Sequence, residues 1–356
     1  MRLKKLFPNL IAPILFAVLC AASCQPPGPT PTPPVDTHLE GIYILNEGLF
    51  QHNNSTLSYY DFTNETLHSD LFVEVNQRGL GDTGNDLQRY GSKLYCVVNN
   101  SHRVDVLDFA TARSVKVISL PGKSPRYITF YQGKAFVSCF DGDVVRIDTA
   151  TLEVDLTARS GNNPEGLCVC NGKLYVANSG GLNNPDYDKT VSIFDAGTLT
   201  LLKTLEVGVN PYRVHADGES LNVYVCSRGD YIDHGGTLSR IDARTDQVTR
   251  TWQNVQNFTL FGNKAYVYEV DYNGGANPVN VIDLDHPDEE AQPFITDGTA
   301  IQMPYCISVN PLNEDVYIAD SHDFTVTGDV YCFDKEGKRK FSFPAGLNPC
   351  AIVFKY

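Results

Sequence analysis

One pattern recurs seven times along this chain and constrains its fold more than any other feature: an apolar strand with an aromatic residue, then a short strand that ends on aspartate. The aromatic residues are Tyr43, Tyr95, Phe136, Tyr175, Tyr224, Tyr266 and Tyr317, and the aspartates are Asp61, Asp108, Asp148, Asp195, Asp242, Asp283 and Asp334. Successive aromatic residues are 39 to 52 positions apart, which is the spacing of four-stranded propeller blades. Because a single blade cannot bury both faces of its sheet, such units must stack around an axis. The sequence predicts an all-β, seven-bladed β-propeller with four-stranded antiparallel blades.

The candidate strands alternate polar and apolar residues as half-buried strands do, for example in residues 173–178 and 191–195. Glycines and Asn-Pro pairs lie where the strands must reverse, and no comparable stretch has helical periodicity. Most units open with a proline-led strand, but the first aromatic strand, residues 41–45, has none before it. Residues 348–354 have the form of that missing strand. We therefore expect the ring to close by pairing the C-terminal strand with the first blade, which leaves no free sheet edge.

The first residues have the form of a bacterial lipoprotein signal peptide. Basic residues precede an apolar run, residues 10–19, that is too short to span a bilayer. Small residues then lead to Cys24 and resemble a lipobox, in which the cysteine is acylated; an ordinary secretory leader is the alternative. A proline-rich segment without charge follows and suits a semi-rigid tether. We expect a signal peptide at 1–23, a tether at 24–40 that starts at lipidated Cys24, and a propeller at 41–356.

Charge and cysteine positions exclude some classes of function. The net charge of −14 would repel a phosphate-rich polymer, so nucleic acid is not an expected partner. Cysteines beyond residue 24 all lie within candidate strands, and Cys168 and Cys170 alternate with Val169 on one face of one strand, where they cannot easily bond each other. We expect buried free thiols rather than disulfides or a zinc site.

Ligand-binding residues are expected on one face of the propeller. There, the loops entering the inner strands and the loops joining second to third strands surround the mouth of the central channel. The latter loops range from two residues at His102 to long segments at 179–189, 227–236 and 268–278, which would wall a depression. Their residues are rich in aromatic and amide groups with a few arginines, as in a binding surface. The candidate ligand-binding residues are Phe50, His102, Arg126, Tyr127, Glu165, Tyr187, Tyr212, Arg213, Arg228, Tyr231, Tyr272 and Tyr305.

The sequence contains weaker signals for a catalytic site than for a binding surface. There is no Gly-x-Ser-x-Gly motif, and His102, His234 and His322 fall in different blades. Carboxylates at the starts of the inner strands are mainly Asp86 and Glu165, whereas a metal-dependent propeller hydrolase needs several. Residues 183–188 form either a polar turn or a calcium ligand set. The sequence predicts a binding protein rather than an enzyme, with no catalytic residues, metal or cofactor.

Two segments resemble known propeller proteins. Residues 174–178 followed by 191–195 are similar to the YVTN-type propeller repeat, and this likeness extends from Gly41 to the C-terminus. Residues 44–48 with residues 53–61 resemble the opening of propeller surface lipoproteins of Bacteroidetes, which include the BtuG cobalamin-capture family.

That resemblance implies a lipid-anchored protein of the outer membrane, exposed at the cell surface, which captures cobalamin (vitamin B12) or related corrinoids. It also implies a TonB-dependent outer-membrane transporter as the partner that receives the ligand. Tyrosine and phenylalanine rings suit the corrin plane, and Arg126, Arg213 or Arg228 suit its phosphate. Two alternatives stay open. One is a scaffold that binds another nutrient, a glycan or a protein, and the other is an extracytoplasmic metal-dependent hydrolase or lyase that uses Glu165 or His234.

Overall fold

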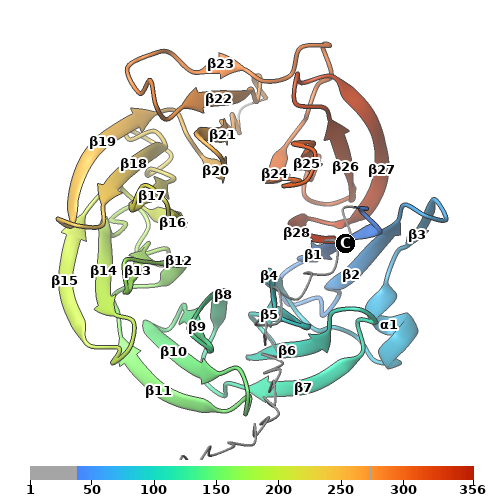
Figure 1. The fold of residues 1–356 in the computed structure, drawn as a ribbon, viewed down its shortest axis with the longest axis horizontal. Helices are drawn as coiled ribbons and strands as arrows, with labels where there is room; N and C mark the ends of the chain where they lie inside the picture. Colours follow the sequence, from blue (N-terminus) through green and yellow to red (C-terminus); the bar gives the residue numbers. More distant parts are fainter. Residues whose placement is uncertain (1–37, 273) are drawn as a thin grey trace, which may run out of the picture. The chain divides into compact units, whose positions relative to one another are not determined.

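Seven four-stranded antiparallel sheets form a closed ring in the computed structural model, which describes residues 38–272 and 274–356 (Figure 1). The chain passes around the ring once, from the blue first blade to the red last blade. This confirms the predicted seven-bladed propeller. The predicted signal peptide, the lipidation site Cys24 and most of the predicted tether lie outside the described residues. Within them, no helix is long and apolar enough to cross a membrane.

The strands of each blade follow from the innermost to the outermost. Blade 1 has β28 (Pro349–Lys355), β1 (Gly41–Asn46), β2 (Thr56–Asp61) and β3 (Thr66–His68). Blade 2 has β4 (Gly84–Tyr90), β5 (Lys93–Val98), β6 (Arg103–Asp108) and β7 (Ser114–Ser119). Blade 3 has β8 (Pro125–Tyr131), β9 (Lys134–Cys139), β10 (Asp143–Asp148) and β11 (Val154–Arg159). Blade 4 has β12 (Pro164–Cys170), β13 (Lys173–Asn178), β14 (Thr190–Asp195) and β15 (Leu201–Glu206).

The remaining blades keep the same order. Blade 5 has β16 (Pro211–Asp217), β17 (Asn222–Ser227), β18 (Thr237–Asp242) and β19 (Gln247–Gln253). Blade 6 has β20 (Asn257–Phe261), β21 (Lys264–Tyr268), β22 (Val279–Asp283) and β23 (Gln292–Pro293). Blade 7 has β24 (Pro304–Val309), β25 (Val316–Asp320), β26 (Thr327–Phe333) and β27 (Arg339–Leu347).

The two ends of the described chain close the ring in blade 1. β28 pairs antiparallel with β1, from Gly41 opposite Lys355 to Asn46 opposite Pro349, with a register shift at the last position. This ladder confirms the predicted closure. It satisfies backbone groups that would otherwise form two open sheet edges.

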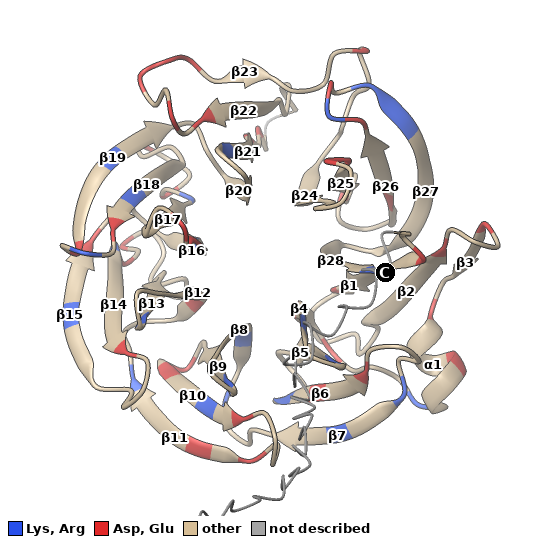
Figure 2. Cartoon of the chain, viewed as in Figure 1, with Lys and Arg blue, Asp and Glu red and all other residues tan. Residues whose placement is uncertain are grey.

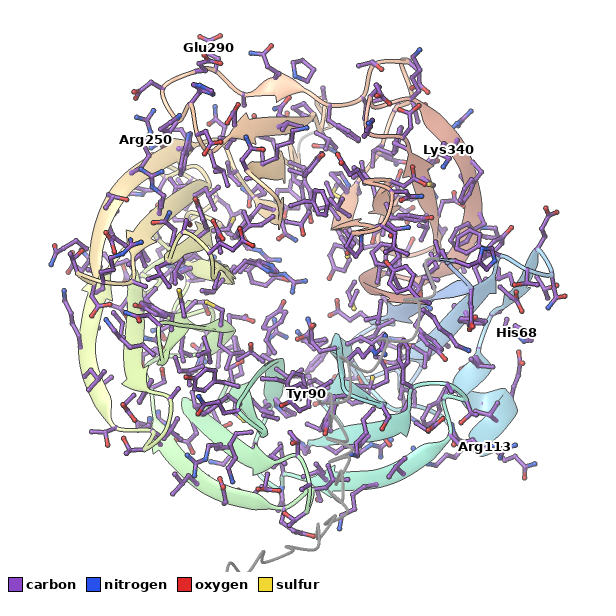
Figure 3. All side chains as sticks on the ribbon, viewed as in Figure 1. His68, Tyr90, Arg113, Arg250, Glu290 and Lys340 are labelled. Atoms are coloured by element: carbon purple, nitrogen blue, oxygen red, sulfur yellow. The ribbon has the colours of Figure 1, made fainter. Side chains whose placement is uncertain are left out.

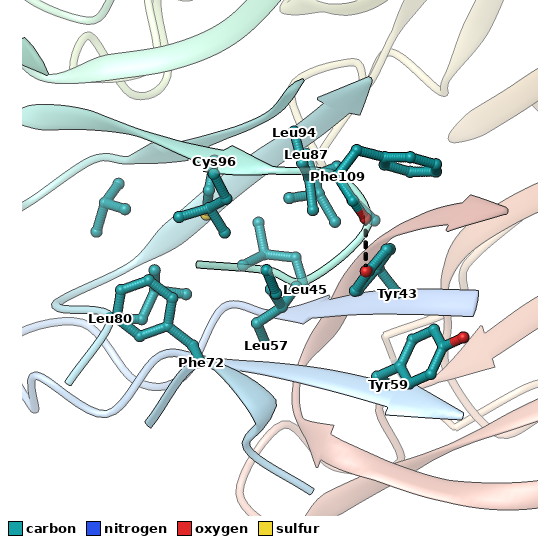
Figure 4. Close-up of a cluster of buried hydrophobic side chains, with 14 of the residues drawn as sticks. Tyr43, Leu45, Leu57, Tyr59, Phe72, Leu80, Leu87, Leu94, Cys96 and Phe109 are labelled. Carbon is teal, nitrogen blue, oxygen red and sulfur yellow. Dashed lines mark hydrogen bonds between the residues drawn. The ribbon is translucent and has the colours of Figure 1, made fainter. Parts of the chain in front are cut away.

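The repeated aromatic residue has a structural role in every blade. Each of the seven lies on the second strand and is at most 1 % exposed. In Figure 4, Tyr43 packs among Leu45, Leu57 and Leu94 between blades 1 and 2, and its hydroxyl donates a 2.7 Å hydrogen bond to the carbonyl of Phe109. A large ring therefore fills the space between neighbouring sheets, while its polar atom ties the two blades together.

The repeated aspartate lies at the end of the third strand or directly after it, where its side chain caps the following turn. Asp195 is typical: its carboxylate accepts hydrogen bonds from the backbone N–H and the hydroxyl of Thr198, at 2.7 and 2.9 Å. These bonds hold the pKa of Asp195 below its usual value. The aspartate signal in the sequence is therefore a turn signal rather than a catalytic one.

One helix, α1 (Leu71–Asn76), joins blade 1 to blade 2, where the sequence pattern indicated no helix. The carboxylate of Asp70 accepts a hydrogen bond from the backbone N–H of Val73 and caps the helix, and Phe72 is buried beneath it. Six residues are too few to show a helical period, which explains the omission.

The strand cysteines are free and buried in the described chain. Burial raises the pKa of the Cys168 thiol well above its usual value, so the thiol stays protonated. Charged side chains lie all around the ring (Figure 2), and Arg250, Glu290 and Lys340 lie on its outer edge (Figure 3). The thiols therefore act as small core residues.

Candidate functional site

One face of the ring gathers the loops that enter the inner strands and the loops between second and third strands. In blade 4, Pro164 at the start of β12 pairs with Asn178 at the end of β13; in blade 5, Pro211 pairs with Ser227. The following loops, at 179–189 and 228–236, therefore rise from the same face as the inner-strand starts. We call this side the loop face.

Arg126, at the start of β8, is paired with an acid at the centre of the ring. Its guanidinium donates two hydrogen bonds to the Glu165 carboxylate, at 2.8 and 3.0 Å, and one to the Asn85 side-chain oxygen, at 2.6 Å. Figure 2 shows the basic β8 and the acidic end of β12 facing the centre. Glu165 is buried and neutralises the charge of Arg126, so this pair is a structural bridge between blades 3, 4 and 2.

Arg213 and Arg228 are held differently. The Arg228 guanidinium carbon lies 3.3 Å from the centroid of the Tyr212 ring, and that of Arg213 lies 4.6 Å from the centroid of the Tyr127 ring. Within the described residues, no carboxylate is within ion-pair distance of either guanidinium. Stacking on an aromatic face leaves the N–H edge of a guanidinium unoccupied, so both can bind an anion.

The tyrosines beneath these arginines form a buried layer. The hydroxyl of Tyr127 donates to the hydroxyl of Tyr212 at 2.6 Å, and both residues are buried. Beside them, the Tyr305 hydroxyl donates to the Glu47 carboxylate. Burial raises the pKa of Glu47 above its usual value, although the hydrogen bond from Tyr305 opposes that shift. Tyr127 and Tyr212 therefore support the arginines from within the blades, whereas Glu47 and Tyr305 are only partly buried.

Three tyrosines from successive blades form an arch at the surface of the loop face. Tyr187, Tyr231 and Tyr272 come from the loops of blades 4, 5 and 6, and their rings meet edge to face with centroids 6.2 and 5.9 Å apart. Tyr231 is 48 % exposed and Tyr272 is 56 % exposed. The arch therefore presents aromatic surface to solvent beside Arg228, an arginine without a carboxylate partner among the described residues.

Asp230 organises the loop that carries the central tyrosine. Its carboxylate accepts hydrogen bonds from the backbone N–H groups of Ile232, Asp233 and His234, at 3.0, 2.9 and 2.8 Å, and also contacts the His234 ring nitrogen Nδ1. Tyr231 itself has a φ of +64°, which is unusual for a bulky residue. The Asp230 bonds offset the cost of that backbone conformation.

Several cavities adjoin these groups. One of about 920 Å³ lies between the loops of blades 6 and 7, and one of about 30 Å³ lies between it and Arg228. A third, of about 290 Å³, lies inside the ring and is lined by Asp86, Arg213 and His215. Burial and the nearby Arg213 charge lower the pKa of His215 to about 4, so this imidazole is neutral at physiological pH.

Ten of the twelve candidate residues lie either in the arch or among the arginines, tyrosines and Glu165 near the centre of the ring. These are Arg126, Tyr127, Glu165, Tyr187, Tyr212, Arg213, Arg228, Tyr231, Tyr272 and Tyr305. Phe50 is 61 % exposed at the tip of the blade 1 loop, and His102 contacts the Lys123 carbonyl in blade 2. Neither contacts the arch or the arginines in the described chain.

Sequence reasoning missed Glu47, Asn85 and Phe324. Asn85 occupies the second position of its inner strand, as Arg126 and Glu165 do in theirs. Comparing that position across blades would have found it. Glu47 and Phe324 lie in loops, and nothing in the sequence pattern shows which loop side chains turn toward the centre. Within residues 38–272 and 274–356, no group of three or more histidine, cysteine or acidic side chains is arranged to hold a metal ion.

Comparisons with solved structures show the fold. A quinonprotein alcohol dehydrogenase-like protein from Bacteroides thetaiotaomicron has a TM-score of 0.65 and 18% identity over 88% of this chain and 78% of its own. The computationally designed Ika8 protein has a TM-score of 0.58 and 15% identity over 90% and 92% of the two chains. Hydrazine synthase from Kuenenia stuttgartiensis has a TM-score of 0.57 and 15% identity over 69% and 74%.

The sequence itself matches no curated protein. One family model matches residues 40–354, which is nearly the whole described propeller. The chain therefore belongs to the family described as Domain of unknown function (DUF5074).

Proposed function

We propose that this propeller is a non-catalytic binding protein that captures cobalamin or a related corrinoid on its loop face. The observation that carries the proposal is the combination of the tyrosine arch with Arg213 and Arg228, whose guanidinium edges have no carboxylate partner among the described residues. A ligand that suits this arrangement has a broad flat surface and an anionic group. A corrinoid has both, since its ring is broad and its nucleotide tail carries a phosphate.

The arrangement favours Arg213 and Arg228 over Arg126 as phosphate ligands. Arg126 already donates to two Glu165 oxygens and to Asn85, so binding a phosphate would require breaking that buried pair. Arg228 keeps its N–H edge unused beside the exposed Tyr272 and Tyr231. Tyr187, Tyr231 and Tyr272 would contact the ring, and Arg228 beside Tyr272 would contact the phosphate.

The partner and the location belong to the same proposal. The loop tips that surround the mouth carry exposed apolar side chains, with Leu182 at 76 % and Ile232 at 73 % exposure. Such side chains at the rim of a mouth suit docking to another protein. We infer that the receiving partner is a TonB-dependent outer-membrane transporter, and that a lipid on Cys24 anchors the chain to the outer membrane at the cell surface.

The hydrolase alternative would need Glu165 or His234 to act on a substrate. Glu165 is buried and bonded to Arg126, and the His234 ring contacts Asp230 in an exposed loop of blade 5. Both side chains have a structural partner that accounts for their position. In a binding role, Glu165 can stay bonded to Arg126 and His234 can stay in contact with Asp230.

Calorimetric titration of cyanocobalamin into the full chain, purified in detergent, tests the proposal. Binding should be weakened by Tyr187→Ala and by Tyr231→Ala, because each removes a ring from the arch. Tyr131→Ala, at the far end of β8, is the matched control and should bind as the unchanged protein does. An unchanged protein that gives no heat with cyanocobalamin or with cobinamide would refute corrinoid capture.

A further inference from the structure

The cavity of about 920 Å³ between blades 6 and 7 is walled by parts of both blades. Apolar side chains, including Val279, Ile295 and Ile301, line it, and Tyr272 and Phe324 add aromatic walls. Its size is within the range of small-molecule sites. It is therefore large enough for a ring system together with an attached sugar.

The Asn277 side chain fixes the two walls of the cavity to each other. Its oxygen accepts a hydrogen bond from the backbone N–H of Asp271 at 2.6 Å, and its nitrogen donates to the carbonyl of Gln302 at 2.5 Å. Gln302 is anchored in turn, because its backbone N–H donates to the buried Asp320 carboxylate at 2.8 Å. The blade 6 loop and the segment leading to blade 7 are thus joined before any ligand arrives, which lowers the entropy cost of binding.

The same cavity adjoins the arginine site. The small cavity of about 30 Å³ shares Tyr272, Met303 and Phe324 with it, and Arg228 and Tyr305 form its other side. Phe324 also packs edge to face on Tyr305, with centroids 5.8 Å apart. One ligand can therefore reach from the large cavity to the guanidinium of Arg228 along continuous aromatic walls.

The charges at the large cavity and at Arg228 differ, so they favour one orientation of such a ligand. The residues lining the large cavity include Asp271, His322 and Asp323 and no lysine or arginine, whereas Arg228 is on the other side. An anionic group is repelled from the first side and attracted to the second. A neutral aromatic group is compatible with the first side, where aromatic walls allow stacking.

We propose that this cavity is a subsite for a neutral heteroaromatic base joined through a sugar to a phosphate, with the phosphate held by Arg228. The inference rests on the proposed function, since the cavity belongs to the same loop face and the inference specifies which part of the ligand binds there. For a corrinoid, the occupant is the nucleotide tail. The exposed Gln302 side chain at the cavity wall supplies an amide for hydrogen bonds to the base or the sugar.

Three probes and two matched variants test the subsite by calorimetry on the full chain in detergent. The probes are cyanocobalamin, cobinamide, which lacks the nucleotide tail, and α-ribazole 3′-phosphate, which is the tail alone. Ala300→Trp fills the cavity from a residue that does not line the small cavity at Arg228. Ala150→Trp, an exposed alanine in the turn after β10, adds the same side chain elsewhere.

If the subsite binds the nucleotide tail, Ala300→Trp should raise the Kd of cyanocobalamin by about tenfold or more. This is the order of magnitude expected when a stacked base loses its contacts. The Kd of cobinamide should stay unchanged, and Ala150→Trp should change neither. Equal effects of Ala300→Trp on both corrinoids, or no effect on either, would overturn the inference. Phe324→Leu removes one aromatic wall without adding bulk and gives the same comparison if Ala300→Trp fails to fold.

The tail alone separates this inference from the proposed function. If the unchanged protein binds neither corrinoid, the proposed function fails. The subsite then stands only if α-ribazole 3′-phosphate binds and Ala300→Trp abolishes that binding while Ala150→Trp does not. If the corrinoids bind and Ala300→Trp does not distinguish them, the subsite fails and the proposed function stands.

Discussion

The guanidinium of Arg228 lies over the ring of Tyr212, with its carbon 3.3 Å from the ring centroid. Tyr212 cannot move away from this contact easily, because it is buried and bonded to the Tyr127 hydroxyl. A cation held by a ring has its donors still available, unlike one held by a carboxylate. Arg228 and Arg126 therefore have opposite roles, although both lie near the centre of the ring.

Replacing Arg228 should weaken ligand binding without unfolding the protein. Arg228→Gln removes a charged donor from the anion site, and we expect the Kd of a ligand that carries a phosphate, such as cyanocobalamin, to rise by about tenfold or more. The melting temperature should change little, because no carboxylate loses a partner. Arg228→Lys keeps the charge but loses the guanidinium and should give an intermediate Kd. Unchanged affinity in Arg228→Gln would show that the anion lies elsewhere.

Replacing Arg126 should have the opposite effect. Arg126→Gln leaves the buried Glu165 carboxylate without its partner, and we expect the free energy of unfolding to fall by about 3 kcal/mol. Urea unfolding measures this loss. Glu165→Gln is the matched change on the other side, and the double variant should be more stable than the sum of the two losses predicts, because neither charge is then unpaired. Additive losses would argue against a coupled pair.

Asp230 should be a positioning residue for the tyrosine arch. Asp230→Ala removes the acceptor of three backbone hydrogen bonds, so the Tyr231 backbone should leave its φ of +64° and the arch should lose its centre. We expect weaker ligand binding with a cooperative unfolding transition like that of the unchanged protein. Asp230→Asn retains one carboxamide oxygen and should recover part of the affinity. A purely local structural role would leave the Kd unchanged in both variants.

His215 should make stability depend on pH between 6.5 and about 4. The folded pKa of about 4 lies below the usual 6.5, so unfolding takes up a proton in this window. The His215 contribution is complete above pH 6.5 and is lost as the pH falls toward 4, by up to about 3 kcal/mol. His215→Gln should flatten the dependence in this window, measured by urea unfolding at several pH values.

Two buried acids make that comparison with His215→Gln necessary. Burial raises the pKa of Asp86 and of Glu47, so protonation of these groups stabilises the fold as the pH falls. Their effect has the opposite sign to that of His215. Only the difference between the unchanged protein and His215→Gln isolates the histidine, and equal slopes for the two would refute its role.

The fold was predictable from the sequence because it depends on local signals that recur. The aromatic residue of each second strand is buried between blades, and the aspartate after each third strand caps a turn, as Tyr43 and Asp195 illustrate. The closing strand was also predictable, since residues 348–354 have the pattern of the other inner strands. The helix α1 was not, because six residues carry too little periodicity.

The candidate site was predictable only as a set of residue types on one face. Loop placement put the residues of the arch and the arginines on one face, but it treated Arg126 and Arg228 alike. Whether an arginine pairs with an acid or stacks on a ring depends on blades that are distant in sequence, as with Arg126 and Glu165. The cavity between blades 6 and 7 depends on Asn277 joining two segments, and no single-residue signal marks such a contact.

The pairing of β1 with β28 also determines where a reporter protein or a surface linkage can be attached to the propeller. Asn348 is next to Glu47 on the loop face, and Glu40 is hydrogen-bonded to Lys355 at the opposite side of the ring. Both the first and the last residues of the propeller therefore emerge from blade 1 on the side away from the mouth. A reporter protein or a surface linkage attached at either end would leave the tyrosine arch open to solvent.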